Sequence, residues 1–220
     1  MTEPLMYINI PGFEEYPHVT YTWLIMIMFA VVTLVVRGAL RLVPEGWQNL
    51  FEVILVSLAD FMDSSIGHGG RKFMPLIGTL ALFILVANLL GLFPGMSSPT
   101  ANINTNVALA VTVFVIYQLV GIKKHGVAYF KQFLGPVWWL APMMLPIEVI
   151  SHLARPVTLA VRLFGNIRGE DMVILVLGFL VPLLLPIPMM AFAVFTSILQ
   201  MLVFILLSMV YLAGALSEEH

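Results

Sequence analysis

The feature that most constrains the fold of this chain is a series of apolar runs, each long enough to cross a lipid bilayer. The first covers residues 21–43, and others follow at 73–94 and 107–123. A helix of roughly 20 apolar residues spans a hydrocarbon core of about 30 Å. The runs therefore predict an all-α, polytopic membrane protein with about five membrane-embedded helices.

Composition supports this class and excludes others. Hydrophobic residues make up 60% of the 220 residues and charged residues only 10%, whereas soluble domains carry about 25% charged residues. The chain has no cysteine, which excludes disulfides and thiolate metal sites. The net charge of -2 argues against a nucleic-acid partner. No basic stretch followed by an apolar core begins the sequence, so we expect no cleavable signal peptide.

Basic residues predict the orientation of the helices. Residues 1–20 contain three acids and no lysine or arginine, Arg37 and Arg41 lie at the end of the first run, and Lys123 and Lys124 follow the third. Because basic residues mark the cytoplasmic side, we expect the N-terminus outside and the Lys123 end inside.

We expect one membrane domain over residues 1–220. Its predicted parts are an outer N-terminal segment (1–20), a first span (21–43), an amphipathic interfacial helix (44–67), a second span (73–94), an outer loop (95–106), a third span (107–123), an interfacial segment (127–140), a helix containing Arg162 (142–167) and a last long helix (171–216).

The final third of the chain leaves two arrangements open. Residues 168–171 are polar and predict a turn, and the next 45 residues, 172–216, contain no charge. A straight helix of that length measures about 67 Å, more than twice the hydrocarbon thickness. Either the chain turns back at Pro182, Pro186 and Pro188, or one long bent helix lies strongly tilted.

Arg162 is the most informative single residue. Its charge is permanent, and a charge at membrane depth costs roughly 3 kcal/mol or more, so such residues usually mark an ion pathway. At about 100° per residue, five polar groups fall on one stripe of the helix, with His152 at its edge. The five are Glu148, Ser151, Arg155, Arg162 and Asn166. This stripe must face protein or water.

The stripe also has a purely structural interpretation. Glu148 and Arg155 are seven residues apart, about two helical turns, and could form an ion pair within the bundle. Arg162 has no acid three or four residues away, so its partner should come from another helix or chain. A hydrogen bond between Gln200 and Arg162 would satisfy both side chains.

At these residues the chain resembles a known family. The segment RPVTLAVRLFGN, Glu148 fourteen residues before Arg162, and Gln200 thirty-eight residues after it are similar to subunit a of F-type ATP synthases. PTANINTNVALA and the terminal SEEH fit its bacterial and chloroplast members. The resemblance extends from about Trp47 onward. It implies a stator subunit, not an enzyme by itself, that faces a rotating ring of c subunits and provides two offset half-channels for protons. It also favours a long, tilted hairpin for the last two helices.

The resemblance assigns roles to individual residues. Arg162 matches the essential arginine that faces the ring carboxylate, and a fixed cation favours the ionised form of that carboxylate. Glu148, Ser151 and His152 match the inner half-channel. The outer half-channel is matched by four residues, which are Asn88, Glu170, Asp171 and Gln200. No cofactor or metal site is implied.

Three departures from the family pattern affect the outer route. Asp171 stands where the family often has Glu or His, Asn102 where some members have Asp, and Ala193 where certain members have His. Glu170 and Asp171 could share the transfer, or one could cap a helix, because acids are favoured at helix N-termini.

The resemblance also implies partners and location. The expected partners are the c-subunit ring, the b subunits of the peripheral stalk, the rest of the synthase and the lipid membrane. A bacterial inner membrane is the expected location, with a thylakoid membrane as the alternative. A secondary ion transporter or channel is the competing function, although such proteins more often show inverted repeats, and none is evident here.

Overall fold

A computed structural model describes residues 17–39, 46–67, 70–93, 95–126, 129, 141–180 and 186–216. It contains helices α1 (Pro17–Ala39), α2 (Trp47–Ile66), α3 (Met74–Leu90), α4 (Ile103–His125), α5 (Ala141–Leu180) and α6 (Pro186–Leu216), with short 3₁₀ helices η1 (Gly70–Phe73) and η2 (Pro99–Ala101). The described ranges include no strand, which confirms the all-α prediction. Helices α1, α3 (with η1), α4 and α6 are each long and apolar enough to cross a membrane.

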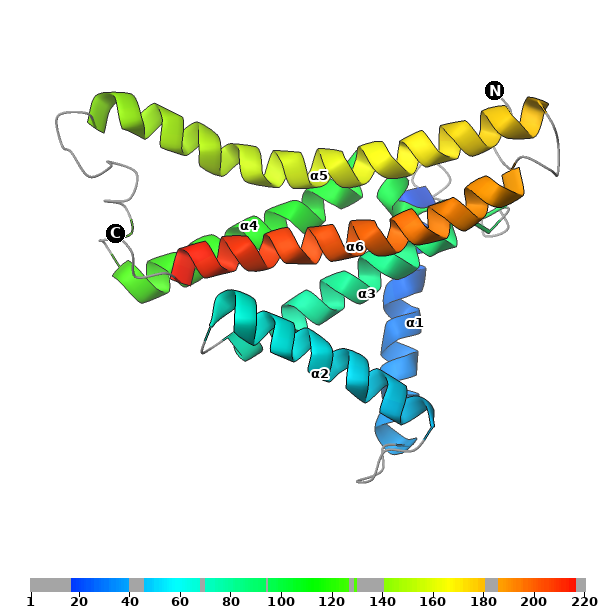
Figure 1. The fold of residues 1–220 in the computed structure, drawn as a ribbon, viewed down its shortest axis with the longest axis horizontal. Helices are drawn as coiled ribbons and strands as arrows, with labels where there is room; N and C mark the ends of the chain where they lie inside the picture. Colours follow the sequence, from blue (N-terminus) through cyan, green and yellow to red (C-terminus); the bar gives the residue numbers. More distant parts are fainter. Residues whose placement is uncertain are drawn as a thin grey trace.

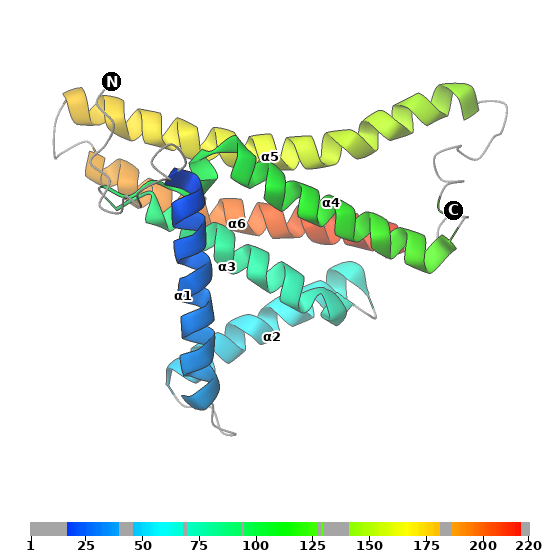
Figure 2. The ribbon, with the colours of Figure 1, turned by 180° about the vertical axis from the view of Figure 1, so that it is seen from behind.

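Helices α5 and α6 run side by side as an antiparallel hairpin along the length of the molecule (Figures 1 and 2). Helix α5 contains 40 residues and is therefore about 60 Å long. A bilayer core is only about 30 Å thick, so a helix of this length must tilt strongly to stay within it. The curvature of α5 in Figure 1 is consistent with Pro146 and Pro156 inside it, because each proline removes a backbone hydrogen bond.

The break between the last two helices differs from the predicted segment boundaries. Residues 168–171, expected as a turn, lie inside α5, which continues to Leu180, and the next described helix begins at Pro186. This position agrees with the proline alternative, since proline is favoured in the first turn of a helix and cannot continue one. The polar residues at 168–171 are tolerated within the helix because they face pockets, described below.

Two other helices begin earlier than expected. Helix α1 begins at Pro17 rather than residue 21. Helix α4 begins at Ile103 rather than residue 107, because the Asn102 side chain accepts a hydrogen bond from the Asn104 backbone N–H at 2.9 Å and caps the helix. Apart from Tyr129, the expected interfacial segment 127–140 lies outside the described residues. The interfacial position of α2 remains a prediction.

The core lies where α3, α4, α5 and α6 meet. It includes Ile77 and Ile84 of α3, Leu163 of α5, and Met209 and Leu212 of α6, each with no exposed surface. Helix α2 adds the fully buried Met62 to the same cluster. Helix α1 stands apart from the other helices over most of its length (Figure 2). Residues 30–38 of α1 are exposed, and apart from Thr33 and Arg37 their side chains are apolar or absent, as lipid contact favours.

One contact ties together two helix ends on the predicted inner side. The Lys124 Nζ donates a hydrogen bond of 2.6 Å to the Leu216 carbonyl, which joins the C-terminal ends of α4 and α6. Lys123, Lys124 and His125 lie in the last turn of α4, where positive charge is favoured by the helix dipole. Following the predicted orientation, we call the opposite ends of α4 and α6 the outer side.

Candidate functional site

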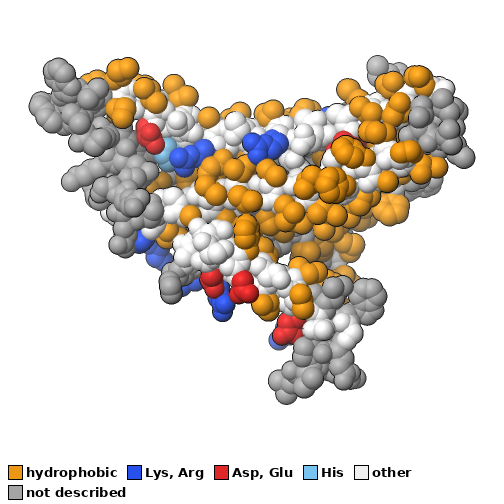
Figure 3. Space-filling model, viewed as in Figure 1, with side chains coloured by type: hydrophobic (Ala, Val, Ile, Leu, Met, Phe, Trp, Pro, Cys, Tyr) orange, Lys and Arg blue, Asp and Glu red, His pale blue; other side chains and the backbone are white. Residues whose placement is uncertain are grey.

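Arg162 lies on the exposed face of α5. Leu159 and Leu163 of the same helix face the core and are 2% and 0% exposed. Helix α5 therefore buries a different face from the one that carries Arg162. Figure 3 shows basic side chains along α5 with hydrophobic side chains below them, and histidine and acidic side chains toward the start of the helix. Among the described residues, no ion pair or hydrogen bond involves Arg162.

Gln200 does not bond Arg162, contrary to our expectation. Its Oε1 accepts a hydrogen bond of 2.6 Å from the Asn166 Nδ2. Asn166 lies one turn beyond Arg162 on the same stripe, and its short amide reaches across to α6. Gln200 is 5% exposed, so the bond satisfies a buried carbonyl. The result is a polar link between α5 and α6 beside an arginine that keeps its full hydrogen-bonding capacity.

The inner part of the stripe forms a second cluster. The Glu148 carboxylate lies 3.5 Å from the His152 Nε2, and the His152 side chain is 4% exposed. The Arg155 guanidinium carbon lies 5.3 Å from the centre of the Tyr211 ring, a cation–π geometry. The possible Glu148–Arg155 pair is not among the described contacts. The predicted inner-channel residues Glu148, Ser151 and His152 lie at the same end of α5. Ser151 is exposed whereas His152 is buried, so these two side chains face different surroundings.

Tyr117 of α4 was not predicted as part of this cluster. Its ring centre lies 6.3 Å from that of His152 and 6.0 Å from that of Tyr211. Tyr117 is 1% exposed, so it forms the inner wall behind the stripe. Its position at helical spacing among apolar residues of α4 gave no sequence signal that distinguished it from an ordinary core residue.

Asn88 lies in a buried hydrogen-bond network rather than in an open pocket. Its Oδ1 accepts from the Thr100 Oγ1 at 2.7 Å, and the Thr100 Oγ1 lies 2.6 Å from the Ser98 Oγ. Ser98 donates to the Ala87 carbonyl at 2.8 Å, and the Asn106 Nδ2 donates to the Thr100 carbonyl at 2.7 Å. This network fixes η2 against α3 and α4, and η2 in turn forms a wall of the outer pocket.

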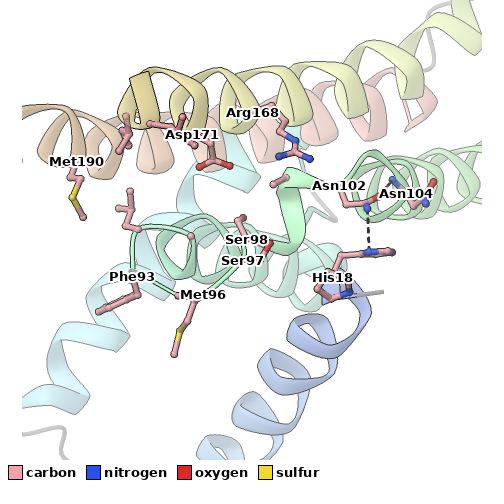
Figure 4. A pocket seen from close by; sticks show the side chains of 17 residues that line it. His18, Phe93, Met96, Ser97, Ser98, Asn102, Asn104, Arg168, Asp171 and Met190 are labelled. Atoms are coloured by element: carbon pink, nitrogen blue, oxygen red, sulfur yellow. Dashed lines mark hydrogen bonds between the residues drawn. The ribbon is translucent and has the colours of Figure 1, made fainter. Parts of the chain in front are cut away.

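The outer pocket is a hollow of about 710 Å³ between α1, α5, and the segment that joins α3 to α4. Asp171 and Arg168 point into it from α5, opposite Asn102 and His18 (Figure 4). The His18 Nδ1 lies 3.1 Å from the Asn102 Nδ2. The ionisable lining residues are His18, Arg168 and Asp171, and the other polar lining residues are neutral. The pocket therefore combines open volume with groups able to exchange protons.

Glu170 belongs to a different hollow from Asp171. This second pocket of about 380 Å³ is lined by Glu170, Asn166 and Thr196 together with Gly165 and Gly169. Among the predicted outer-channel residues, the structure therefore brings Glu170 to the side of the Asn166–Gln200 link and Asp171 to the outer pocket. Asn88 lines neither.

Sequence reasoning missed His18 and Arg168. His18 is 84 residues from Asn102, a separation at which no local pattern indicates contact. Arg168 was assigned to a turn, although its spacing of three residues from Asp171 would have indicated a shared helix face. Within the described residues there is no group of three or more His, Cys, Asp or Glu side chains able to hold a metal ion.

Comparison with known sequences gives the family. The sequence model of the family described as ATP synthase A chain matches residues 19–213. The chain is 54% identical over 212 residues to "ATP synthase subunit a 1" of Syntrophotalea carbinolica, covering 96% of this chain and 91% of that protein. It is 48% identical over 220 residues to "ATP synthase subunit a" of Geobacter sulfurreducens, covering 100% of this chain and 94% of that protein. The chain therefore belongs to the ATP synthase A chain family.

Proposed function

We propose that this chain is the proton-translocating stator subunit a of the membrane sector of an F-type ATP synthase, with Arg162 facing the carboxylate of a c-subunit ring. The observation that carries the proposal is the exposed Arg162 on the polar stripe of an otherwise largely apolar membrane protein, without an ion pair among the described residues. A charge of this kind is too costly to leave in lipid. A carboxylate on a neighbouring chain supplies the missing counterion.

In the proposed mechanism Arg162 acts on protons by electrostatics. Its fixed positive charge favours the ionised ring carboxylate, so a proton arriving on the ring is released before that site passes the arginine. The same charge repels protons and blocks direct passage between the two sides, as arginines do in other pores. The ring must therefore turn for a proton to cross, and this coupling supports ATP synthesis by the rest of the complex.

Two groups of residues support two half-channels. At the inner end, Glu148, Ser151 and His152 provide polar and ionisable groups on α5. At the outer end, Asp171 lines the larger pocket and Glu170 the smaller one. We assign Gln200 to positioning Asn166 beside Arg162, and Asn88 to holding the wall of the outer pocket in place.

The proposed partners follow from this role. The exposed apolar faces of α5 and α6 suit a ring of helices, and the proposed complex also contains the b subunits of the peripheral stalk and the remaining synthase subunits. The similar proteins come from bacteria, and within the described residues four helices are long and apolar enough to cross a membrane. We therefore propose the bacterial inner membrane as the location.

The test is ATP-driven proton pumping in inside-out membrane vesicles that carry Arg162→Ala. We expect pumping to be abolished while the subunit still copurifies with the c ring. Arg162→Lys should fail as well, because an ammonium group does not reproduce the planar, delocalised guanidinium. The control is Arg71→Ala, which removes an exposed arginine whose partners are Asp60 and Asp63 of α2. Pumping retained in an assembled Arg162→Ala complex would refute the assignment and favour a transporter or channel with another ion path.

A further inference from the structure

One hydrogen-bonded contact joins the first turn of α1 to the start of α4 at the wall of the outer pocket. The His18 Nδ1 lies 3.1 Å from the Asn102 Nδ2, and both residues line the pocket (Figure 4). The two residues are 84 positions apart in the sequence. The contact therefore depends on the fold, and its loss would separate two different segments of the pocket wall.

The orientation of the Asn102 amide is fixed by the helix that it caps. Its Oδ1 accepts a hydrogen bond of 2.9 Å from the Asn104 backbone N–H, and only the oxygen of an amide can accept. The Nδ2, which is only a donor, is therefore the atom that meets His18. The His18 Nδ1 must accept in turn, so the contact requires an imidazole without a proton on Nδ1.

Protonation of His18 removes the acceptor on which this contact depends. An imidazolium carries a proton on both ring nitrogens, so an N–H of His18 would then face an N–H of Asn102. An ordinary histidine gains its second proton near pH 6.5. The contact is therefore present while His18 is neutral and is lost as the pH falls through the titration of this side chain.

Charged groups face His18 from α5, across the pocket. Arg168 and Asp171 line that wall, whereas the described lining residues from the α3–η2 segment, η2 and α4 carry no charge. An imidazolium that leaves Asn102 is repelled by Arg168 and attracted by an ionised Asp171. The ionised Asp171 therefore favours a protonated His18 that has turned from the wall toward the pocket.

The following turns of α1 confine this change to the His18 end of the helix. Tyr21 has no exposed surface, and its hydroxyl donates a hydrogen bond of 3.3 Å to the Gly95 carbonyl. Ile25 is also fully buried and packs with Phe83 and Ala87 of α3. Loss of the His18–Asn102 contact therefore frees a side chain without detaching α1.

We propose that the His18–Asn102 contact is a pH-dependent gate of the outer pocket, closed while His18 is neutral and open when His18 is protonated. Separation of the two side chains widens the pocket between α1 and α4. Acid on the outer side then both supplies protons and opens the pocket that receives them. The role in proton entry rests on the proposed stator function, whereas the pH dependence of the gate itself does not.

Thiol labelling inside the pocket tests the gate directly. The chain has no cysteine, so Ser97→Cys introduces a single thiol into this subunit, at a residue that lines the pocket (Figure 4). A membrane-impermeant methanethiosulfonate reagent is applied from the outer side to right-side-out vesicles that contain the complete synthase. Each rate is divided by the rate in the His18→Asn background at the same pH, which cancels the change in thiolate fraction.

His18→Asn is the matched variant because its Oδ1 replaces Nδ1 as the acceptor but does not titrate. The protonated fraction of an ordinary histidine rises from about 3% at about pH 8 to about 90% at about pH 5.5. We therefore expect the normalised rate to be about one at the higher pH and to rise about threefold or more at the lower pH. His18→Ala has no acceptor and should be labelled rapidly at both pH values.

Asn102→Asp provides a test in which the pH dependence should disappear. An aspartate keeps the helix cap but replaces the donor by a carboxylate that binds an imidazolium. Acid should therefore tighten this contact, and the rise in labelling should be lost. A normalised rate that is equal at the two pH values in the Ser97→Cys protein, or a rise that persists in Asn102→Asp, would overturn the proposal.

Proton-driven ATP synthesis in liposomes tests the role in proton entry. The pH on the outer side of the subunit is varied while the total proton-motive force is held constant. His18→Asn should match the unmodified protein at about pH 8 and be about threefold slower at about pH 5.5, because its pocket stays closed. Equal rates at the lower pH would refute a role in proton entry. If Arg162→Ala still pumps in an assembled complex, the stator function fails, but the labelling result still decides whether the gate exists.

Discussion

Replacing Thr100 by valine tests whether buried hydrogen bonds hold η2 in place as a wall of the outer pocket. Thr100 is fully buried in η2, and its hydroxyl contacts both the Asn88 Oδ1 and the Ser98 Oγ. Valine has almost the same shape but no hydroxyl, so the change removes polar contacts with little loss of volume. Asn88 then loses a donor and Ser98 loses a neighbour, both in a site closed to water.

The size of the effect follows from the hydrogen bond to Asn88, because the Ser98 hydroxyl already donates to the Ala87 carbonyl. Removing the donor of a buried acceptor destabilises the native state by about 1–3 kcal/mol, which corresponds to a factor of about 5–150 in an equilibrium constant. Thr100→Ser keeps the hydroxyl and loses one methyl group, at a cost of about 0.8 kcal/mol. Valine should therefore be the more harmful substitution.

The measurement is the half-life of proton pumping during heating, in synthase reconstituted into liposomes. We expect Thr100→Val to shorten the half-life about fivefold or more, and to shorten it more than Thr100→Ser does. Thr112→Val is the matched control, because Thr112 is exposed on α4 and bonds only the Ala108 carbonyl of its own helix. A Thr100→Val protein as durable as the control, or more durable than Thr100→Ser, would show that packing rather than hydrogen bonding holds this wall.

Two further predictions follow, the first measured by the same heating assay and the second by the initial rate of proton pumping. Gly121→Ala should destabilise the protein by about 1–3 kcal/mol, because a Cβ at this position collides with the Tyr129 ring, whereas Gly78→Ala on α3 meets no atom within 4 Å and should be neutral or slightly stabilising. Asn166→Ala and Gln200→Ala should each slow pumping less than Arg162→Ala, and their double-mutant cycle should give a coupling of about 0.6–1.7 kcal/mol; additive effects would show that the 2.6 Å bond contributes nothing.

The sequence predicted the helices well and their boundaries less well. Apolar runs predict membrane helices because lipid contact requires apolar side chains along most of the length. The same reasoning misplaced the end of α5, because Arg168, Glu170 and Asp171 suggested a turn. A polar residue fits inside a membrane helix when it faces a cavity, and cavities depend on how helices pack. The prolines near 182–188 were the better signal, since their effect on the backbone is local.

The candidate site shows the same division between local and tertiary information. Helical spacing alone placed Arg162 and Asn166 on one stripe, and the exposure of both residues is consistent with that placement. The partner of Gln200 could not be predicted, since Arg162 and Asn166 lie one turn apart on that stripe and spacing along α5 does not show which of them meets α6. The approach of His18 to Asn102 depends on where α1 crosses η2, which no periodicity indicates.

The polar groups of this apolar protein divide according to whether their partners lie within the chain. The Thr100 hydroxyl donates to the Asn88 Oδ1 and helps to fix a wall, whereas Arg162 is exposed and has no ion pair within the described residues. In the proposed mechanism, the attraction between Arg162 and a ring carboxylate at about 4 Å is about 1 kcal/mol in water but about 4 kcal/mol near a protein surface. An attraction of that size holds the ring in place unless the carboxylate is neutralised. In this mechanism a proton delivered through the outer half-channel removes the negative charge, so that half-channel both supplies the transported ion and releases the ring for its next step.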